Sequence, residues 1–183
     1  MKLIPFLQKH NINYMPINLL IMENNKKKLT CYSDGTMPSY TDFRDRPDLV
    51  EERKQYIDKY EYVWIDTYVV HQFDIDKKEY DPKIYEKFAY FKSIVKGFPH
   101  YFVPLSEPCR DLKNAYALKD GMGDVLCGQG SYAKIDSVVH NPKVFEKSTL
   151  TPEKFKSFIE STSNKNLSTS SNKGKTSKKN KDS

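Results

Sequence analysis

Two aspartates two residues apart, Asp74 and Asp76, end an otherwise apolar stretch at residues 68–76. In a β-strand, side chains at positions i and i+2 project from the same face, about 6.6 Å apart along the strand. Carboxylates at this spacing suit one or two hard cations, because Mg²⁺ prefers carboxylate oxygens together with water and substrate phosphates. Two lysines follow at once, so we expect the acids at the C-terminal end of the strand, where ligands gather in α/β sheets. The alternative is a solvated strand end whose acids pair with nearby lysines.

A second group of residues has the chemistry to bind phosphate. His100 begins an apolar stretch after Gly97, and Lys96 lies just upstream. If this strand neighbours the strand of Asp74, the imidazole can donate to phosphate oxygens while the ammonium acts as a point charge. The alternative is a core histidine bonded to backbone, with Lys96 as a favourable charge at a helix C-terminus.

A glycine-rich stretch at residues 121–130 holds four of the seven glycines and a third candidate acid, Asp124. Glycines let the backbone approach a ligand closely, or they form hairpin turns. The chain has no GxxxxGK[ST] motif, so this stretch is not a Walker P-loop. Asp124 could bring a third carboxylate to the metals or be a turn acid. Lys134 could reach phosphate or nucleic acid, or simply face solvent.

Hydrophobic periodicity predicts the elements that must position these residues. The helices are expected over residues 3–10, 46–60, 81–97 and 151–160. The strands are expected over residues 14–22, 62–65, 68–75, 100–105, 123–128 and 131–139. The third helix has the strongest signals, with Asp81 as N-cap, Pro82 in the first turn and Gly97 as the stop. Interleaved helices and strands predict an α/β or α+β domain with one central mixed sheet flanked by helices.

The 183 residues suffice for one domain, expected over residues 1–160, and a tail over residues 161–183. The tail contains six lysines, one aspartate, one leucine and no aromatic residue, so it carries +5 of the net charge of +6. It cannot bury enough apolar surface to offset its chain entropy, and we predict disorder. Such a tail either promotes solubility or makes salt-sensitive contacts with nucleic-acid phosphates.

Several classes of protein are disfavoured by the sequence. No apolar run approaches the roughly 20 residues of a membrane span, and the N-terminus lacks the apolar region of a signal peptide. The three cysteines, Cys31, Cys109 and Cys127, show no CxxC spacing, which argues against a disulfide framework or a zinc ribbon. We therefore expect an intracellular protein without membrane contact.

The order of these motifs resembles the archaeo-eukaryotic primase superfamily. It is most similar to the primase-polymerase domains at the N-terminus of primase–helicases of large DNA viruses and plasmids. FDID looks like the first motif, GFPHYF the second, and GDVLCGQGSYAK the viral form of the third. Residues 13–43 look like the entry strand and loop of the family, which places Lys28 near the site. The resemblance covers about residues 3–142, and Phe98 stands where the family usually has a serine.

This resemblance implies template-dependent nucleotidyl transfer. Two divalent cations, Mg²⁺ or Mn²⁺, would be held by the three acids, while His100 and Lys96 would hold the triphosphate. Lys28 and Lys134 are further candidates for nucleotide contact. The implied partners are a single-stranded DNA template, nucleoside triphosphates and a replicative helicase, and the implied location is a viral replication site in the host cytoplasm or nucleus.

Two other functions fit the same residues. A catalytically weak or inactive relative would bind nucleic acid or a helicase without synthesis. A glycosyltransferase with a DxD motif, or a phosphohydrolase, would also use acids at a strand end, but would leave the ordered His100 and Asp124 segments unexplained.

Overall fold

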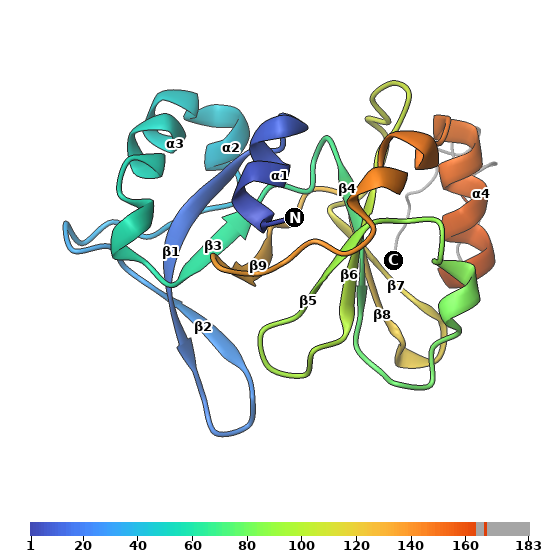
Figure 1. The fold of residues 1–183 in the computed structure, drawn as a ribbon, viewed down its shortest axis with the longest axis horizontal. Coiled ribbons are helices and arrows are strands. Elements are labelled where there is room, and N and C mark those ends of the chain that lie inside the picture. The colour runs from blue at the N-terminus through green and yellow to red at the C-terminus, as the bar shows by residue number, and fades with distance from the viewer. Residues whose placement is uncertain (164–166, 168–183) are drawn as a thin grey trace, which may run out of the picture.

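Two antiparallel sheets dominate the computed structural model, which describes residues 1–163 and 167 (Figure 1). The first sheet has the strand order β2-β1-β3-β9, and the second has the order β5-β6-β4-β8-β7. Neighbouring strands run antiparallel in both. The described part of the chain is therefore a single α+β domain, and the expected single mixed sheet is wrong. Residues 164–166 and 168–183, most of the expected tail, lie outside the described residues.

The first sheet packs its outer face against two short helices. Met15, Ile17 and Trp64 meet Phe43 and Val50 there, and all five are buried. The strands of this sheet are β1 (Tyr14–Ile21), β2 (Lys27–Thr30), β3 (Tyr62–Ile65) and β9 (Ser131–Lys134). The helices are α2 (Asp42–Asp45) and α3 (Pro47–Lys54), followed by the 3₁₀ turn η1 (Ile57–Lys59).

The second sheet packs one face against the C-terminal helix α4 (Pro152–Ser163). Phe155 and Ile159 of that helix share a buried core with Phe73 and Ile75 of the sheet. Leu167, a residue of the expected tail, packs against the same core. The strands are β4 (His71–Ile75), β5 (Tyr90–Lys92), β6 (Pro99–Val103), β7 (Ala115–Ala117) and β8 (Gly123–Leu126).

A third core joins the two sheets. Helix α1 (Leu3–Lys9) buries Phe6 and Leu7 against Ile65 of the first sheet and Phe102 of the second, and Figure 1 shows it between them. Four 3₁₀ turns complete the described chain: η2 (Pro82–Ile84), η3 (Lys119–Gly121), η4 (Pro142–Val144) and η5 (Glu146–Ser148). No helix in the described residues is long and apolar enough to cross a membrane.

The expected helix over residues 81–97 is wrong. Asp81 does cap the segment by accepting from the Lys83 backbone N–H at 3.1 Å, but only η2 follows, and β5 occupies residues 90–92. A helix would place Phe88 and Phe91 on one face, whereas Phe88 belongs to the core under α4 and Phe91 to the core between the sheets. Burial on both sides of the second sheet therefore overrides the local helix signals.

The other sequence-based elements are mostly present with altered bounds. β3 coincides with its prediction, and the expected helix over residues 46–60 divides into α3 and η1. β2, β5 and β7, each of three or four residues, were not expected. The strands of Asp74 and His100 are neighbours, and they pair antiparallel.

Candidate active site

One row of residues across the second sheet brings the three motifs together. Asp74 on β4 lies directly opposite His100 on β6 and directly opposite Asp124 on β8. Residues opposite each other in antiparallel strands project from the same face, with Cβ atoms about 5 Å apart. Asp76 follows the end of β4 and, two residues on, leans to the same side. Segments far apart in the sequence therefore present their acids and one imidazole on a common face.

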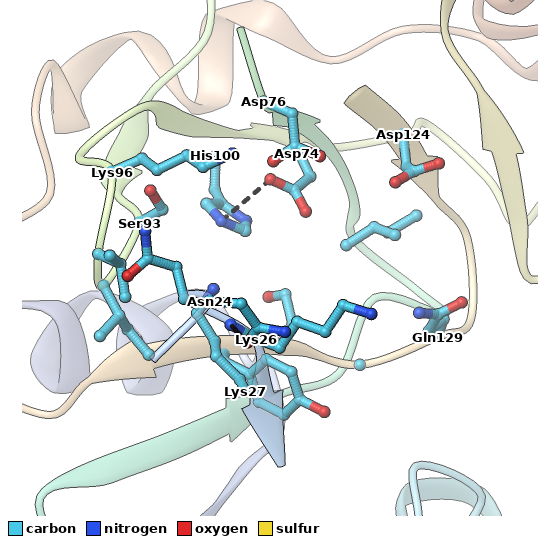
Figure 2. A pocket seen from close by; sticks show the side chains of 17 residues that line it. Asn24, Lys26, Lys27, Asp74, Asp76, Ser93, Lys96, His100, Asp124 and Gln129 are labelled. Carbon is cyan, nitrogen blue, oxygen red and sulfur yellow. Dashed lines mark hydrogen bonds and ion pairs between the residues drawn. The ribbon is translucent and has the colours of Figure 1, made fainter. Parts of the chain in front are cut away.

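These side chains form one wall of a pocket of about 300 Å³ that draws residues from both sheets. Figure 2 shows the acids and His100 facing the tip of the β1–β2 hairpin, which carries Lys26 and Lys27. The turn between β5 and β6 closes one end with Ser93 and Lys96, and the segment after β8 closes the other with Gln129. The pocket is therefore acidic on one side and basic on the other.

Asp74 and His100 are in direct contact, with 3.2 Å between Oδ1 and Nε2. Burial raises the pKa of Asp74 to about 7, and the neighbouring charge of Asp76 acts in the same direction, while Lys27 and Lys96 oppose it. Burial likewise lowers the pKa of His100 to about 3, with Lys27 adding to the effect. The imidazole is thus neutral at physiological pH, and the contact is a hydrogen bond between a neutral ring and a carboxyl group.

The three acids repel one another in the pocket. Burial raises the pKa of Asp124, and repulsion from Asp74 and Asp76 raises it further. None of the ion pairs among the described residues joins these acids to a lysine or an arginine. A divalent cation would relieve this repulsion, so the donor set fits Mg²⁺ or Mn²⁺ in charge and in ligand type.

The positions of the candidate protein ligands limit how many of them could bind one cation. Among the described residues, no group of three His, Cys, Asp or Glu side chains could hold a metal ion as placed. Mg²⁺ commonly binds through one or two carboxylates and completes its octahedron with water and substrate phosphates. The pocket therefore fits a cation that arrives with a phosphate-bearing ligand better than a permanently enclosed metal.

The structure brings five of the seven sequence-predicted residues together and leaves two out. Asp74, Asp76, Asp124, His100 and Lys96 all line the pocket. Neither Lys28 nor Lys134 does, although Lys28 is the neighbour of Lys27, which lines the pocket. Side chains alternate along a strand, so Lys27 faces the acids while Lys28 faces away. Lys134 ends β9 opposite Tyr62 and is exposed.

Several lining residues were missed by the sequence analysis. Lys27 has the strongest electrostatic influence among them, since its charge acts on both Asp74 and His100. The sequence analysis predicts no strand over residues 23–43, so it offers no reason to place Lys27 opposite the acids. The pair Asn24–Asn25 was a usable signal: Asn25 adopts a left-handed conformation with φ 65°, and such residues mark hairpin turns.

A glycine allows the two acid-bearing strands to approach each other. Gly123 has φ 146° and lies opposite Ile75. A Cβ atom at this position would lie 1.9 Å from the carbonyl oxygen of Asp74. The residue before Asp124 must therefore be glycine for Asp124 to sit beside Asp74.

Comparisons of the chain with protein-family models, with curated proteins and with solved structures found no match. Function must therefore be argued from the geometry of the pocket and from the order of its motifs.

Proposed function

We propose that the chain is a primase-polymerase-type nucleotidyltransferase that acts with Mg²⁺ or Mn²⁺. The observation that carries the proposal is the row His100–Asp74–Asp124 in a pocket whose opposite wall bears Lys27, with Lys96 at one end. The bound cations would neutralise phosphate charge and activate the attacking hydroxyl. Paired acids facing paired lysines is the arrangement that a metal-bound triphosphate requires, because it needs carboxylates for the cation and cationic groups for its free oxygens.

The residues of the pocket divide into two roles under this proposal. Asp74, Asp76 and Asp124 would hold the cations. Lys27 and Lys96 would attract and orient the triphosphate, and His100 would donate a hydrogen bond to one of its oxygens. The turn between β5 and β6 brings Ser93 into the pocket, where its hydroxyl can serve as a further donor in place of the serine that Phe98 replaces.

The proposed partners are a single-stranded DNA template, nucleoside triphosphates and a replicative helicase. Outside residues 161–183 the chain carries a net charge of only +1, which provides little of the phosphate neutralisation that supports DNA binding. We therefore propose that the basic C-terminal segment or the helicase supplies most of the affinity for template, at a viral site of replication.

Primer synthesis on a single-stranded template is the direct test. Wild-type protein with Mg²⁺ or Mn²⁺ and nucleoside triphosphates is expected to yield template-dependent oligomers. Asp74→Asn and Asp124→Asn should each abolish them, whereas Asp58→Asn, an exposed acid outside the pocket, should not. Absence of product from wild type, or unchanged product from Asp74→Asn, would refute the proposal.

A second candidate is a nucleotide- or nucleic-acid-binding protein without chemistry. It is favoured by one observation, that the described residues offer no group of three side chains that could hold a metal ion. Binding of template measured by gel shift, retained in Asp74→Asn and Asp76→Asn while wild type makes no oligomers, would select this candidate. Turnover of a nucleotide sugar or a simple phosphoester without template would instead indicate a glycosyltransferase or a phosphohydrolase.

A further inference from the structure

Residues 66–70, the crossover turn, connect β3 of the first sheet to β4 of the second. The carboxylate of Asp66 accepts a hydrogen bond from the Tyr68 backbone N–H at 2.9 Å, and the Thr67 hydroxyl donates to the backbone carbonyl of Gln129. Asp66 and Thr67 are buried, with exposed fractions of 7% and 0%. The turn is therefore fixed in place beside Gln129, the residue that closes one end of the pocket.

The crossover turn presents a cation stacked on an aromatic ring, next to an exposed apolar side chain. The guanidinium of Arg44 lies over the Tyr68 ring, with 4.4 Å between Cζ and the ring centroid. Arg44 is exposed, Tyr68 is half-buried, and Val69 is 64% exposed. Burial raises the pKa of Asp66, while the Tyr68 N–H and the charge of Arg44 oppose this, so the acid attracts the guanidinium toward the turn. Because Arg44 is exposed, the face of its guanidinium that points away from Tyr68 is open to a ligand.

The two ends of the pocket differ in a way that sets the direction of a bound nucleotide. Lys96 lies at one end, and Gln129 lies at the other (Figure 2). Leu126, Gly130 and Tyr132, which line the pocket together with Gln129, carry no charge. A triphosphate at the Lys96 end therefore leaves the uncharged base toward Gln129. A template base that pairs with this nucleotide must then approach from beyond Gln129, where the crossover turn lies.

We propose that the crossover turn and Arg44 form the surface on which the single-stranded DNA template lies where it enters the pocket. An unpaired base stacks on the open face of the Arg44 guanidinium, which the Tyr68 ring supports from behind, and Val69 contacts the neighbouring base. Guanidinium planes and aromatic rings bind the unstacked bases of single strands with little dependence on sequence. This placement rests on the proposed function, because the position of the triphosphate determines the end at which the template enters.

Fluorescence anisotropy of the full chain with a labelled oligothymidylate tests the surface without any chemistry, in EDTA and without nucleotide. A salt concentration of about 0.3 M weakens contacts that depend on charge alone. Arg44→Ala should raise the Kd about fivefold or more, and Arg44→Lys, which keeps the charge but loses the planar group, should raise it nearly as much. Tyr68→Leu should weaken binding, while Tyr68→Phe should not. Arg46→Ala is the matched control, an exposed arginine that lies over no ring among the described residues, and should change the Kd less than about twofold.

Photocrosslinking gives a second reading that does not depend on any substitution. An oligothymidylate that contains 5-iododeoxyuridine should crosslink to Tyr68 on irradiation, as located by mass spectrometry of the digested chain. Absence of binding by wild type, crosslinks that all lie outside residues 66–70, or equal effects of Arg44→Ala and Arg46→Ala would each overturn the proposal. Wild-type affinity in Arg44→Lys would also overturn it, because charge alone would then explain the binding.

The outcomes also separate this surface from the proposed function. If wild type makes primers while Arg44→Ala binds template normally, the surface is wrong and the proposed function stands. If wild type makes no primers while Arg44→Ala loses binding, the proposed function fails, and the crossover turn remains a binding site for single-stranded DNA.

Discussion

The two faces of β4 have opposite chemical character. On one face, His71, Phe73 and Ile75 are buried and pack toward α4, where Phe155 stacks on His71 with centroids 4.9 Å apart. On the other face, Asp74 lines the pocket, and the buried Gln72 contacts His100 with 3.4 Å between Oε1 and Nδ1. Burial keeps Asp74 and His100 from ionising normally. A single strand thus carries apolar contacts that hold the fold and polar groups whose burial is unfavourable without a ligand. Alternate residues of β4 therefore serve different purposes: one set stabilises the fold and the other forms the candidate site.

Substitution of neighbouring residues on β4 should give opposite results. Phe73→Ala removes a fully buried ring that contacts Tyr85, Phe88 and Phe155, so we expect the free energy of unfolding to fall by about 3–5 kcal/mol. Asp74→Asn removes an acid whose ionisation burial and repulsion from Asp76 oppose, so the free energy of unfolding should not fall and should rise at pH 7. Urea denaturation at pH 7 measures both. A large loss in Asp74→Asn would mean that the two faces are not separable.

The close contact between the backbones of β4 and β8 should make the fold sensitive to substitution of Gly123. Gly123→Ala places a methyl group against the carbonyl of Asp74 and forces a side chain into a left-handed conformation. We expect a loss of about 2–4 kcal/mol in the free energy of unfolding, together with loss of activity. Gly35→Ala is the matched control, since Gly35 also has a positive φ of 85° but has no atom within 4 Å of its added Cβ; a loss as large there would show that strain alone, not the clash, is responsible.

The burial of His71 should make the free energy of unfolding depend on pH. Burial lowers the pKa of His71 below 6.5, although its Nδ1 is bonded to the Thr67 carbonyl at 2.8 Å. The unfolded chain then binds more protons than the folded one below about pH 6.5, so stability is lost as the pH falls through this value. Between pH 7.5 and 5.5, wild type should lose about 1 kcal/mol more than His71→Asn in urea denaturation. Equal losses would contradict the prediction; contributions from Asp74 and His100 are common to both proteins and cancel.

The adjacent lysines Lys27 and Lys28 on β2 should differ in their effect on the KM for nucleotide. Lys27→Ala should raise the KM for nucleotide by about three- to tenfold, because it removes a charge that faces the acids. Lys28→Ala, from the other face of the same strand, should change it less than about twofold. Steady-state kinetics of primer synthesis, or nucleotide binding by calorimetry, measures the difference. Equal effects would mean that overall charge, not the orientation of Lys27, attracts the ligand.

The candidate acids could be found from the sequence because their signals are local. Asp74, Asp76 and Asp124 stand at strand ends that composition alone predicts, and the order of the motifs suggested that His100 belongs with them. Their convergence depends on a register, Asp74 opposite both His100 and Asp124, which no local signal specifies. The same holds for Gln72, whose polar character is visible in the sequence but whose contact with His100 depends on strand pairing.

The errors in the fold have a common physical cause. The stretch over residues 81–97 satisfies the rules for a helix, which would place Ile84 and Val95 on one apolar face with its phenylalanines. In the structure, Ile84 and Val95 remain 42% and 37% exposed, and the phenylalanines belong to different cores. Tertiary burial outweighed local propensity there. The number of sheets was likewise set by which strands found partners at long range, since Tyr62 of β3 pairs with Lys134 of β9, far along the sequence.

The hairpin that carries Lys26 and Lys27 is built differently from the wall it faces. Residues Asn18–Ile21 of β1 pair with β2, whereas only Tyr14–Ile17 pair with β3, so the hairpin runs past the body of its sheet as a two-stranded ribbon (Figure 1). Leu19 and Leu29 attach the ribbon to the core under α2 and α3, so the tip can bend about this point while the core stays packed. Bending of the hairpin would change the distance between its lysines and the aspartates, so the width of the pocket can adjust to the size of the bound ligand.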